Sequence, residues 1–121
     1  MARILVIDDE KLVRASIDAV LSAKGHVVTL AVNGREGLDQ IKKGDFDLII
    51  TDLIMPEMEG IETILAIRKQ STTLRILAIS GGGRRQIGDF LESAAKLGAD
   101  FVLKKPFSND DLIDAVNRAT A

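Results

Sequence analysis

Five short apolar runs alternate with amphipathic segments along the chain, and this alternation limits the fold more than any other feature of the sequence. Each run is continuously apolar rather than alternating in polarity, which is typical of strands buried on both faces of a parallel sheet. The segments between the runs repeat apolar residues at helical spacing. The five runs cover residues 4–7, 27–32, 48–50, 76–79 and 101–103.

Helix start and stop signals divide the remaining residues into five predicted helices. The first spans about 11–24 and ends before Gly25, a common residue just past a helix end. The second starts at Asn33 and ends near Gly44. The third follows Gly60, with the apolar residues Ile61, Ile64 and Leu65 beside Arg68 on its predicted stripe. The fourth covers about 87–98, and the fifth starts at Ser108, with Asp111 completing a capping box.

A strand–helix unit repeated five times predicts an α/β fold with a parallel sheet and right-handed crossovers. We expect a doubly wound, five-stranded, flavodoxin-like (βα)5 domain with strand order 2-1-3-4-5. No linker or low-complexity tract interrupts residues 1–121. We therefore expect one domain and, because the chain stops with the fifth helix, no output domain.

Composition excludes several classes of site. The chain has no cysteine and one histidine, so thiolate catalysis, disulfides and zinc–thiolate sites are excluded. A net charge of −2 without a basic stripe argues against direct nucleic-acid binding. No apolar run is long enough to span a membrane, and the N-terminus does not resemble a signal peptide. We expect a cytoplasmic protein without a membrane partner.

Acidic residues follow two of the apolar runs. Asp8 and Asp9 end the first, and Asp52 ends the third. Strands one and three are neighbours in the predicted order, and ligands bind beyond their C-terminal ends, so these carboxylates should converge. Clustered carboxylates favour a hard divalent cation, Mg²⁺ or else Mn²⁺. Ser80 and Lys105 follow runs four and five and would add a hydroxyl and an ammonium.

This set of groups suits phosphoryl transfer. A carboxylate can attack phosphorus and form an aspartyl phosphate. Beyond in-line positioning, the reaction needs chiefly neutralisation of the phosphoryl oxygens, which a cation, an ammonium and a hydroxyl would provide.

Four segments in register, ILVIDDE, ITDLIMPEMEG, ILAIS and LKKPF, resemble the receiver domain of bacterial two-component response regulators over the whole chain. The resemblance implies that Asp52 is the phospho-acceptor and that Asp9, Asp52 and the backbone carbonyl of Ile54 bind Mg²⁺ directly. Asp8 would hold metal-bound water. Lys105 would pair with the phosphoryl group, and Ser80 would be the switch hydroxyl. In this family the peptide bond before the matching proline, Pro106, is commonly cis.

The resemblance also implies partners and a mode of action. A sensor histidine kinase or a histidine phosphotransfer protein would donate the phosphoryl group. The product would act on an unidentified protein through the face of helix four, strand five and helix five. Such a module catalyses its own phosphorylation and dephosphorylation but is not a turnover enzyme. Homodimerisation stays open. We hypothesise that an apolar stripe of Leu12, Ala15 and Ala19 docks the donor.

Two features depart from the family pattern. The family usually has an aromatic residue at the position of Val102, whereas here the aromatic is Phe101. A shift of one residue in a strand moves a side chain to the opposite face. The segment from Gly81 to Arg85 is rich in glycine and arginine, and we interpret it as a solvated surface loop rather than a phosphate-binding loop.

Alternative interpretations exist for the role of the acidic residues after the first run and for the function of the domain. Asp8 and Asp9 could instead cap the first helix, and Glu10 is interpreted as a first-turn helix charge rather than a ligand. The main functional alternative is a receiver-like adaptor that works without phosphorylation. A nucleotide- or flavin-binding protein is disfavoured because no glycine-rich phosphate loop follows the first strand.

Overall fold

The computed structural model describes residues 1–53, 60–80 and 98–121, with only the backbone of Ser80 described. Within these ranges five strands alternate with four helices. The predicted helix at 87–98 and the loop of residues 81–85 lie outside them. The elements are β1 (Arg3–Ile7), α1 (Lys11–Ala23), β2 (Val27–Ala31), α2 (Gly34–Lys43), β3 (Leu48–Asp52), α3 (Gly60–Gln70), β4 (Arg75–Ser80), β5 (Phe101–Lys104) and α5 (Asn109–Thr120).

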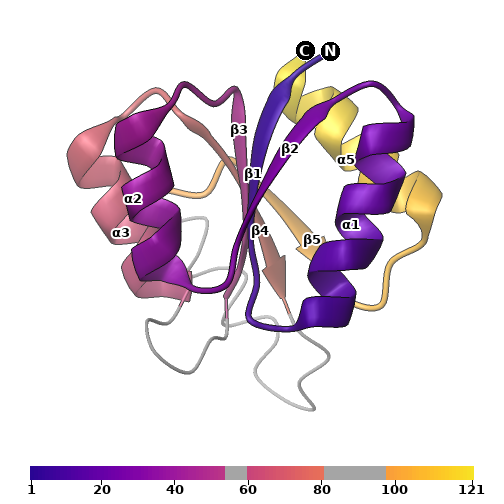
Figure 1. Cartoon of the computed structure of the whole chain (residues 1–121), viewed down its shortest axis with the longest axis horizontal. Coiled ribbons are helices and arrows are strands. Elements are labelled where there is room, and N and C mark those ends of the chain that lie inside the picture. Colours follow the sequence, from indigo (N-terminus) through magenta and orange to yellow (C-terminus); the bar gives the residue numbers. More distant parts are fainter. Residues whose placement is uncertain (54–59, 81–97) are drawn as a thin grey trace.

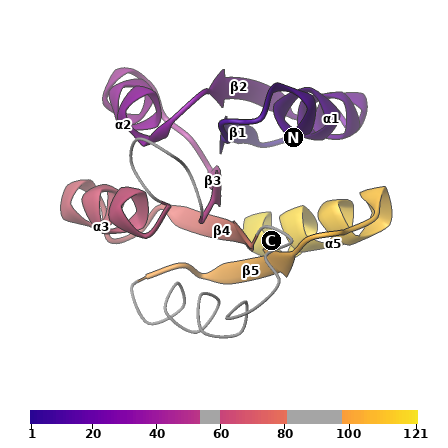
Figure 2. The same cartoon turned by 90° about the horizontal axis from the view of Figure 1, so that it is seen from below.

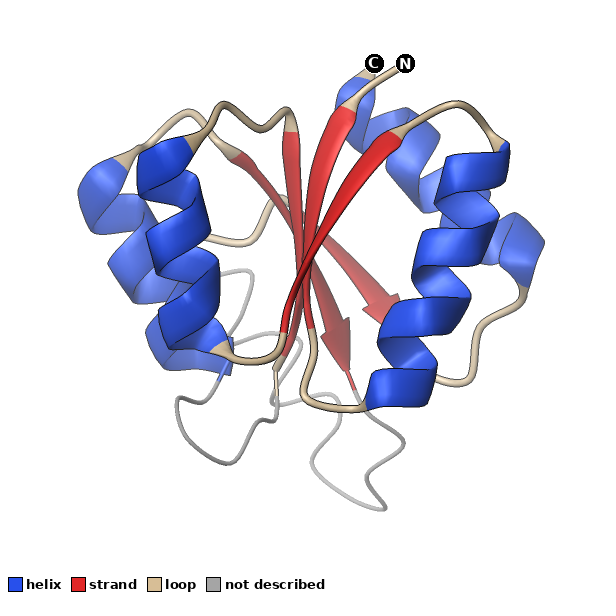
Figure 3. Cartoon of the chain, in the orientation of Figure 1, coloured by secondary structure: helices blue, strands red, loops and turns tan. Residues whose placement is uncertain are grey.

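The five strands form one parallel sheet in the order β2-β1-β3-β4-β5, which confirms the predicted topology. Helices α1 and α5 cover one face, and α2 and α3 cover the other (Figure 1). The view from below shows the same two helical layers on either side of the sheet (Figure 2). All C-terminal strand ends therefore lie along one edge, the lower edge in Figure 3.

Each face of the sheet has its own apolar core. Ile4 and Val6 of β1 pack toward α1 and α5, whereas Leu5 and Ile7 pack toward α2 and α3. This alternation explains why β1 is continuously apolar, because both of its faces are buried. The predicted stripe of α3 needs correction at one place: Leu65 is exposed, and Ile67 is the buried residue.

The predicted helix ends are largely confirmed. Gly25 has a φ of +89°, a left-handed conformation that favours glycine after α1. The Asn33 side chain accepts a hydrogen bond from the backbone N–H of Glu36 and caps α2. Ser108 and Asp111 form the reciprocal capping box of α5. These local features set where α1 ends and where α2 and α5 begin. No helix in the described ranges is both long and apolar enough to cross a membrane.

Strand β5 alternates in burial, which corrects the expectation that the apolar run at 101–103 is buried on both faces. Phe101 and Leu103 pack against the core on the α1 and α5 side, whereas Val102 is 41% exposed. Lys104 is exposed, so the next residue, Lys105, turns back toward the sheet edge. The aromatic ring of this strand thus lies on the face opposite to Val102.

Candidate functional site

The acidic residues meet at the C-terminal edge of the sheet because β1 and β3 are paired in register. Ile7 lies beside Thr51, so Asp8 and Asp52 follow at neighbouring positions. Both carboxylates are buried, with exposed fractions of 1% and 3%. The fold therefore places two acids side by side in a position that bulk water hardly reaches.

Lys105 reaches this pair from the end of β5. Its Nζ atom lies 3.2 Å from Asp52 Oδ2 and 3.7 Å from Asp8 Oδ2. The bond between Lys105 and Pro106 is cis, as the resemblance leads one to expect. The ammonium thus supplies one positive charge to two buried carboxylates, which leaves the group negative.

A third carboxylate at this edge belongs to Glu10 rather than to Asp9. One oxygen each from Asp8, Glu10 and Asp52 lie within 4.8 Å of one another. Glu10 also lies 4.0 Å from Lys105 Nζ. Asp9 is exposed and is not in this group. Periodicity could not predict this, because it does not indicate which of two consecutive loop side chains lies nearer the sheet edge.

The remaining predicted site residues are placed only in part. Ser80 is the last residue of β4 and pairs in register with Lys104, so its backbone lies at the same edge. Its side chain is outside the described residues, as is all of Ile54. Their predicted roles stay predictions.

Hydrogen bonds hold Asp8 in place, but they involve only one of its two carboxylate oxygens. Asp8 Oδ1 accepts the backbone N–H of Glu10 at 2.9 Å, and the Asp8 carbonyl accepts from Arg14 Nη1 at 2.7 Å. Among the described residues, Asp8 Oδ2 is buried and accepts no hydrogen bond. No side chain caps α1 at its N-cap, Glu10, so helix capping does not account for these acids.

Burial shifts the protonation of this group. The pKa of Asp8 is raised to about 6: burial is the largest cause and the Asp52 charge adds to it, whereas the hydrogen bond from the Glu10 N–H and the charge of Lys105 lower it. For Lys105, burial lowers the pKa, but attraction to Asp52, Asp8 and Glu10 outweighs it and leaves the pKa raised. The lysine therefore stays an ammonium at neutral pH. The Asp8 carboxyl loses its proton less readily than an exposed aspartate does.

The residues present fit a divalent cation. Asp8 Oδ2 is buried, accepts no hydrogen bond from the residues that the structure describes, and belongs to the acidic group, an environment that a cation stabilises. The donor set is oxygen only, which suits Mg²⁺ or Mn²⁺ rather than a softer metal. Among the described residues, Asp8, Glu10 and Asp52 have carboxylate oxygens close enough together to share such an ion.

The raised pKa of Asp8 gives a prediction for the metal-free protein. Its native pKa of about 6 lies above the ordinary 3.8, so the unfolded state binds fewer protons between these values. Stability should fall as pH rises through this window. Asp8→Asn removes the charge and should raise the free energy of unfolding by about 2 kcal/mol at pH 7.5. Urea unfolding in EDTA at pH 4 and pH 7.5 measures both.

At pH 4 the difference between Asp8→Asn and the wild type should be much smaller than at pH 7.5, because Asp8 is then protonated in the native state, whereas in the unfolded state, with a pKa of 3.8, it is only partly ionised. Asp45→Asn, at an exposed carboxylate, is the control. A variant less stable than the wild type at pH 7.5 would contradict the prediction.

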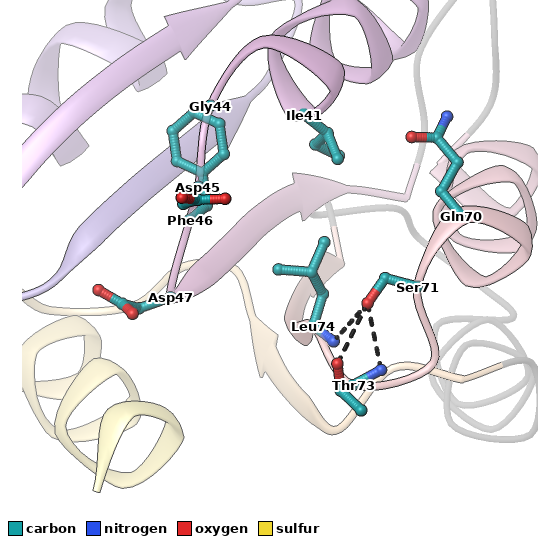
Figure 4. A pocket seen from close by; sticks show the side chains of 9 residues that line it. All are labelled: Ile41, Gly44, Asp45, Phe46, Asp47, Gln70, Ser71, Thr73 and Leu74. Carbon is teal, nitrogen blue, oxygen red and sulfur yellow. Dashed lines mark hydrogen bonds between the residues drawn. The ribbon is translucent and has the colours of Figure 1, made fainter.

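Two hollows of similar volume lie at different edges of the molecule. One, about 480 Å³, is formed by the α2–β3 and α3–β4 connections and so opens at the opposite edge of the sheet (Figure 4). Ser71 in its wall is occupied by hydrogen bonds with Thr73 and Leu74. The other, about 470 Å³, lies between α1 and the start of α5 and is lined by Leu12, Phe107 and Lys105 among others. This second hollow borders the acidic site through Lys105.

Known proteins are similar to this chain in both sequence and fold. A family model described as the response regulator receiver domain matches residues 4–117. The chemotaxis protein CheY of Bacillus subtilis is 34% identical over 118 residues, which cover 96% of this chain and 95% of CheY. The transcriptional regulatory protein DltR of Streptococcus agalactiae is 32% identical over 98% of this chain and 51% of its own length. The chain spans about half the length of the first curated relatives it matches.

Solved structures of receiver domains have the same fold as this chain. A response regulator receiver domain protein from Clostridium thermocellum has a TM-score of 0.89 at 32% identity, covering 99% of this chain and 94% of its own. The chemotaxis protein CheY4 of Vibrio cholerae has a TM-score of 0.90 at 32% identity, covering 98% of both chains. The chain belongs to the receiver domain family of two-component response regulators, whose members are phospho-accepting signalling modules.

Proposed function

We propose that Asp52 accepts a phosphoryl group from a phosphohistidine of a sensor kinase or histidine phosphotransfer protein, in a reaction that depends on Mg²⁺. The observation that carries this proposal is the contact of Lys105 Nζ with Asp52 at 3.2 Å, beside a second buried carboxylate. A nucleophile, a fixed ammonium and a cation-binding acid are thus within one small volume. Phosphoryl transfer requires chiefly positioning and charge neutralisation.

In the proposed reaction an oxygen of Asp52 attacks phosphorus as the bond from phosphorus to the imidazole nitrogen breaks. The imidazole keeps the bonding electron pair and takes a proton from solvent. Asp8 and Asp52 would hold the cation, together with the predicted ligands Asp9 and the carbonyl of Ile54. Mg²⁺, when bound, neutralises charge on the phosphoryl oxygens.

Lys105 is poised for the product state. Its raised pKa keeps it charged, and it already contacts the oxygen of Asp52. After transfer it would pair with the phosphoryl oxygens, and Ser80 would supply a hydroxyl. The new charge of about −1.5 to −2 would bias two conformations that differ by a few kcal/mol. We place the readout on β5 and α5, together with the predicted fourth helix.

The test is the intact mass of the protein after incubation with phosphoramidate or acetyl phosphate, in MgCl₂ and in EDTA. We expect a gain of one phosphoryl group in MgCl₂ and none in EDTA. Beryllofluoride, which occupies the same kind of site, serves as the second probe. Failure of both the mass gain and beryllofluoride binding would favour an adaptor that works without phosphorylation.

We further propose that the donor docks on the hollow between α1 and α5. Leu12 is 83% exposed although it is a large apolar residue, and it lines this hollow beside Lys105 and Phe107. Ala15 and Ala19 line a separate hollow toward β2. Leu12 is therefore the member of the predicted docking stripe nearest to the site. An apolar helix laid here would bring its phosphohistidine toward Asp52.

Leu12→Glu should slow phosphotransfer from the kinase about tenfold or more, because a charge would be buried against the donor helix. Phosphorylation by phosphoramidate should stay within about twofold, because this small donor makes no docking contact. Leu65→Glu, at an exposed leucine on the opposite helical layer, is the matched control. Equal transfer rates to wild type and Leu12→Glu would rule out this docking surface.

A further inference from the structure

We infer that Arg14 is a positioning residue of the acidic site, which holds the loop of residues 8–10 and so keeps Asp8 and Asp9 in place for the cation. This role depends on the proposed Mg²⁺ dependence and adds to it a basic residue outside the acids. Arg14 lies in the first turn of α1, and its side chain is half-buried. Its Nη1 atom donates a hydrogen bond to the Asp8 carbonyl oxygen at 2.7 Å.

The start of α1 lacks the usual side-chain cap. Glu10 is its N-cap residue and makes no capping hydrogen bond with its side chain. Arg14 instead contacts both ends of the loop. Its backbone N–H donates to the Glu10 carbonyl at 3.0 Å, and its guanidinium donates to the Asp8 carbonyl. A capping side chain usually reaches forward into the helix, whereas here a side chain of the first turn reaches back to the end of β1.

The bond from Arg14 fixes the peptide that joins the two aspartates. A peptide unit is planar, so a held carbonyl also sets the direction in which the chain enters Asp9. On its other side, the Asp8 N–H donates to the Ala31 carbonyl at 3.1 Å. Asp8 Oδ1 accepts the Glu10 N–H at 2.9 Å. With Arg14 in place, the backbone of Asp8 is therefore tied on both sides, and its carboxylate starts from a fixed point.

Arg14 acts on the site through the backbone rather than through its charge. The donor is a charged guanidinium at a short distance, which makes this a strong hydrogen bond. In the described part of the chain, no carboxylate forms an ion pair with Arg14. The charges that shift the pKa of Asp8 are those of Asp52 and Lys105. Loss of a group that orients a metal-binding residue weakens metal binding about tenfold to a hundredfold.

The first experiment follows amide hydrogen exchange by NMR in EDTA, where no cation holds the loop. Arg14→Met keeps an unbranched chain but has no donor, whereas Arg14→Lys keeps a charged donor. Arg118→Met removes the same charge from an exposed ion pair with Asp114 and is the control. The Glu10 amide reports the loop, and the amide of Val6, in the middle of β1, reports global unfolding.

In Arg14→Met, we expect the exchange rate of Glu10 relative to that of Val6 to rise at least about tenfold, because the loop opens more often. Arg14→Lys and Arg118→Met should stay within about threefold of the wild type, since one retains a charged donor and the other breaks only an exposed pair. A loss of overall stability alone would raise both rates and would not increase their ratio.

The second experiment is thermal unfolding across a MgCl₂ titration at pH 7.5, with each Tm compared with the same protein in EDTA. We expect Arg14→Met to bind Mg²⁺ at least about tenfold more weakly and Arg14→Lys to recover most of the affinity. Arg14→Gln, whose side chain is too short to reach the carbonyl, should behave as Arg14→Met does.

Unchanged relative exchange of Glu10, or unchanged Mg²⁺ affinity, in both Arg14→Met and Arg14→Gln would overturn the role of Arg14 and leave the proposed function standing. A wild type that Mg²⁺ does not stabilise would overturn both.

Discussion

Asp52→Asn is expected to gain no phosphoryl group from phosphoramidate in MgCl₂, under conditions where the wild type gains one. Asparagine keeps the shape of the side chain but carries a neutral amide in place of the nucleophilic carboxylate. Asp52 is 3% exposed and lies 3.2 Å from Lys105 Nζ, closer than the other buried carboxylate, Asp8, which lies at 3.7 Å. The effect should be complete rather than partial.

The variant should nevertheless stay folded, which makes the result interpretable. Removing the Asp52 charge also removes a repulsion that raises the pKa of Asp8, so Asp8 should ionise more easily. Lys105 would lose its nearest partner but keep Asp8 and Glu10. These changes act in opposite directions, and we expect the Tm in EDTA to change by only about 5 °C or less.

Asp45→Asn is the control for this experiment, because that carboxylate lines the hollow at the far edge of the sheet (Figure 4). It should be phosphorylated like the wild type. A phosphoryl group found on Asp52→Asn would place the acceptor on another side chain, and peptide mapping would identify it.

Gly60→Ala is expected to destabilise the protein by about 3 kcal/mol, although alanine is the better helix former by about 1 kcal/mol. A β-carbon at Gly60 would overlap the carbonyl oxygen of Asp52 and the backbone of Leu53. The Gly60 N–H donates to the Leu53 carbonyl at 2.9 Å, so the start of α3 is held against the end of β3. Backbone atoms on both sides cannot move aside as a flexible side chain could.

The same overlap predicts a functional effect. To relieve it, the backbone that carries Asp52 must shift, and in-line attack tolerates little misplacement. We expect a Tm lower by about 10 °C and slower phosphorylation by phosphoramidate at a temperature where the protein is folded.

Gly44→Ala is the matched control, because a β-carbon there would meet its nearest neighbour at 3.8 Å, an ordinary contact. Its φ of −148° suits any residue. Calorimetry of both variants decides the matter: a Gly60→Ala protein as stable as Gly44→Ala would show that the close approach does not constrain the fold.

Much of the fold could be predicted because its signals are local and periodic. Continuous apolar runs indicated strands buried on two faces, and the sheet confirms the order and direction inferred from them. Cap residues such as Asn33 and Ser108 bond to their own helix, so the starts of α2 and α5 could be predicted from the local sequence. The error at Leu65 has a tertiary cause. Helix α3 is rotated about its axis so that Ile67 is buried and Leu65 is exposed, and its apolar residues alone did not predict this rotation.

By itself, the sequence determined which residues reach the C-terminal edge, because strand order and register follow from patterns along the chain. Asp8, Asp52 and Lys105 meet there as predicted. Only the tertiary structure decided that a Glu10 oxygen lies near those of Asp8 and Asp52 while Asp9 stays apart from them, and that Gly60 packs against the backbone of Asp52 and Leu53. The first depends on side-chain direction in a loop, and the second on packing between two segments. The periodicity of the sequence predicts neither.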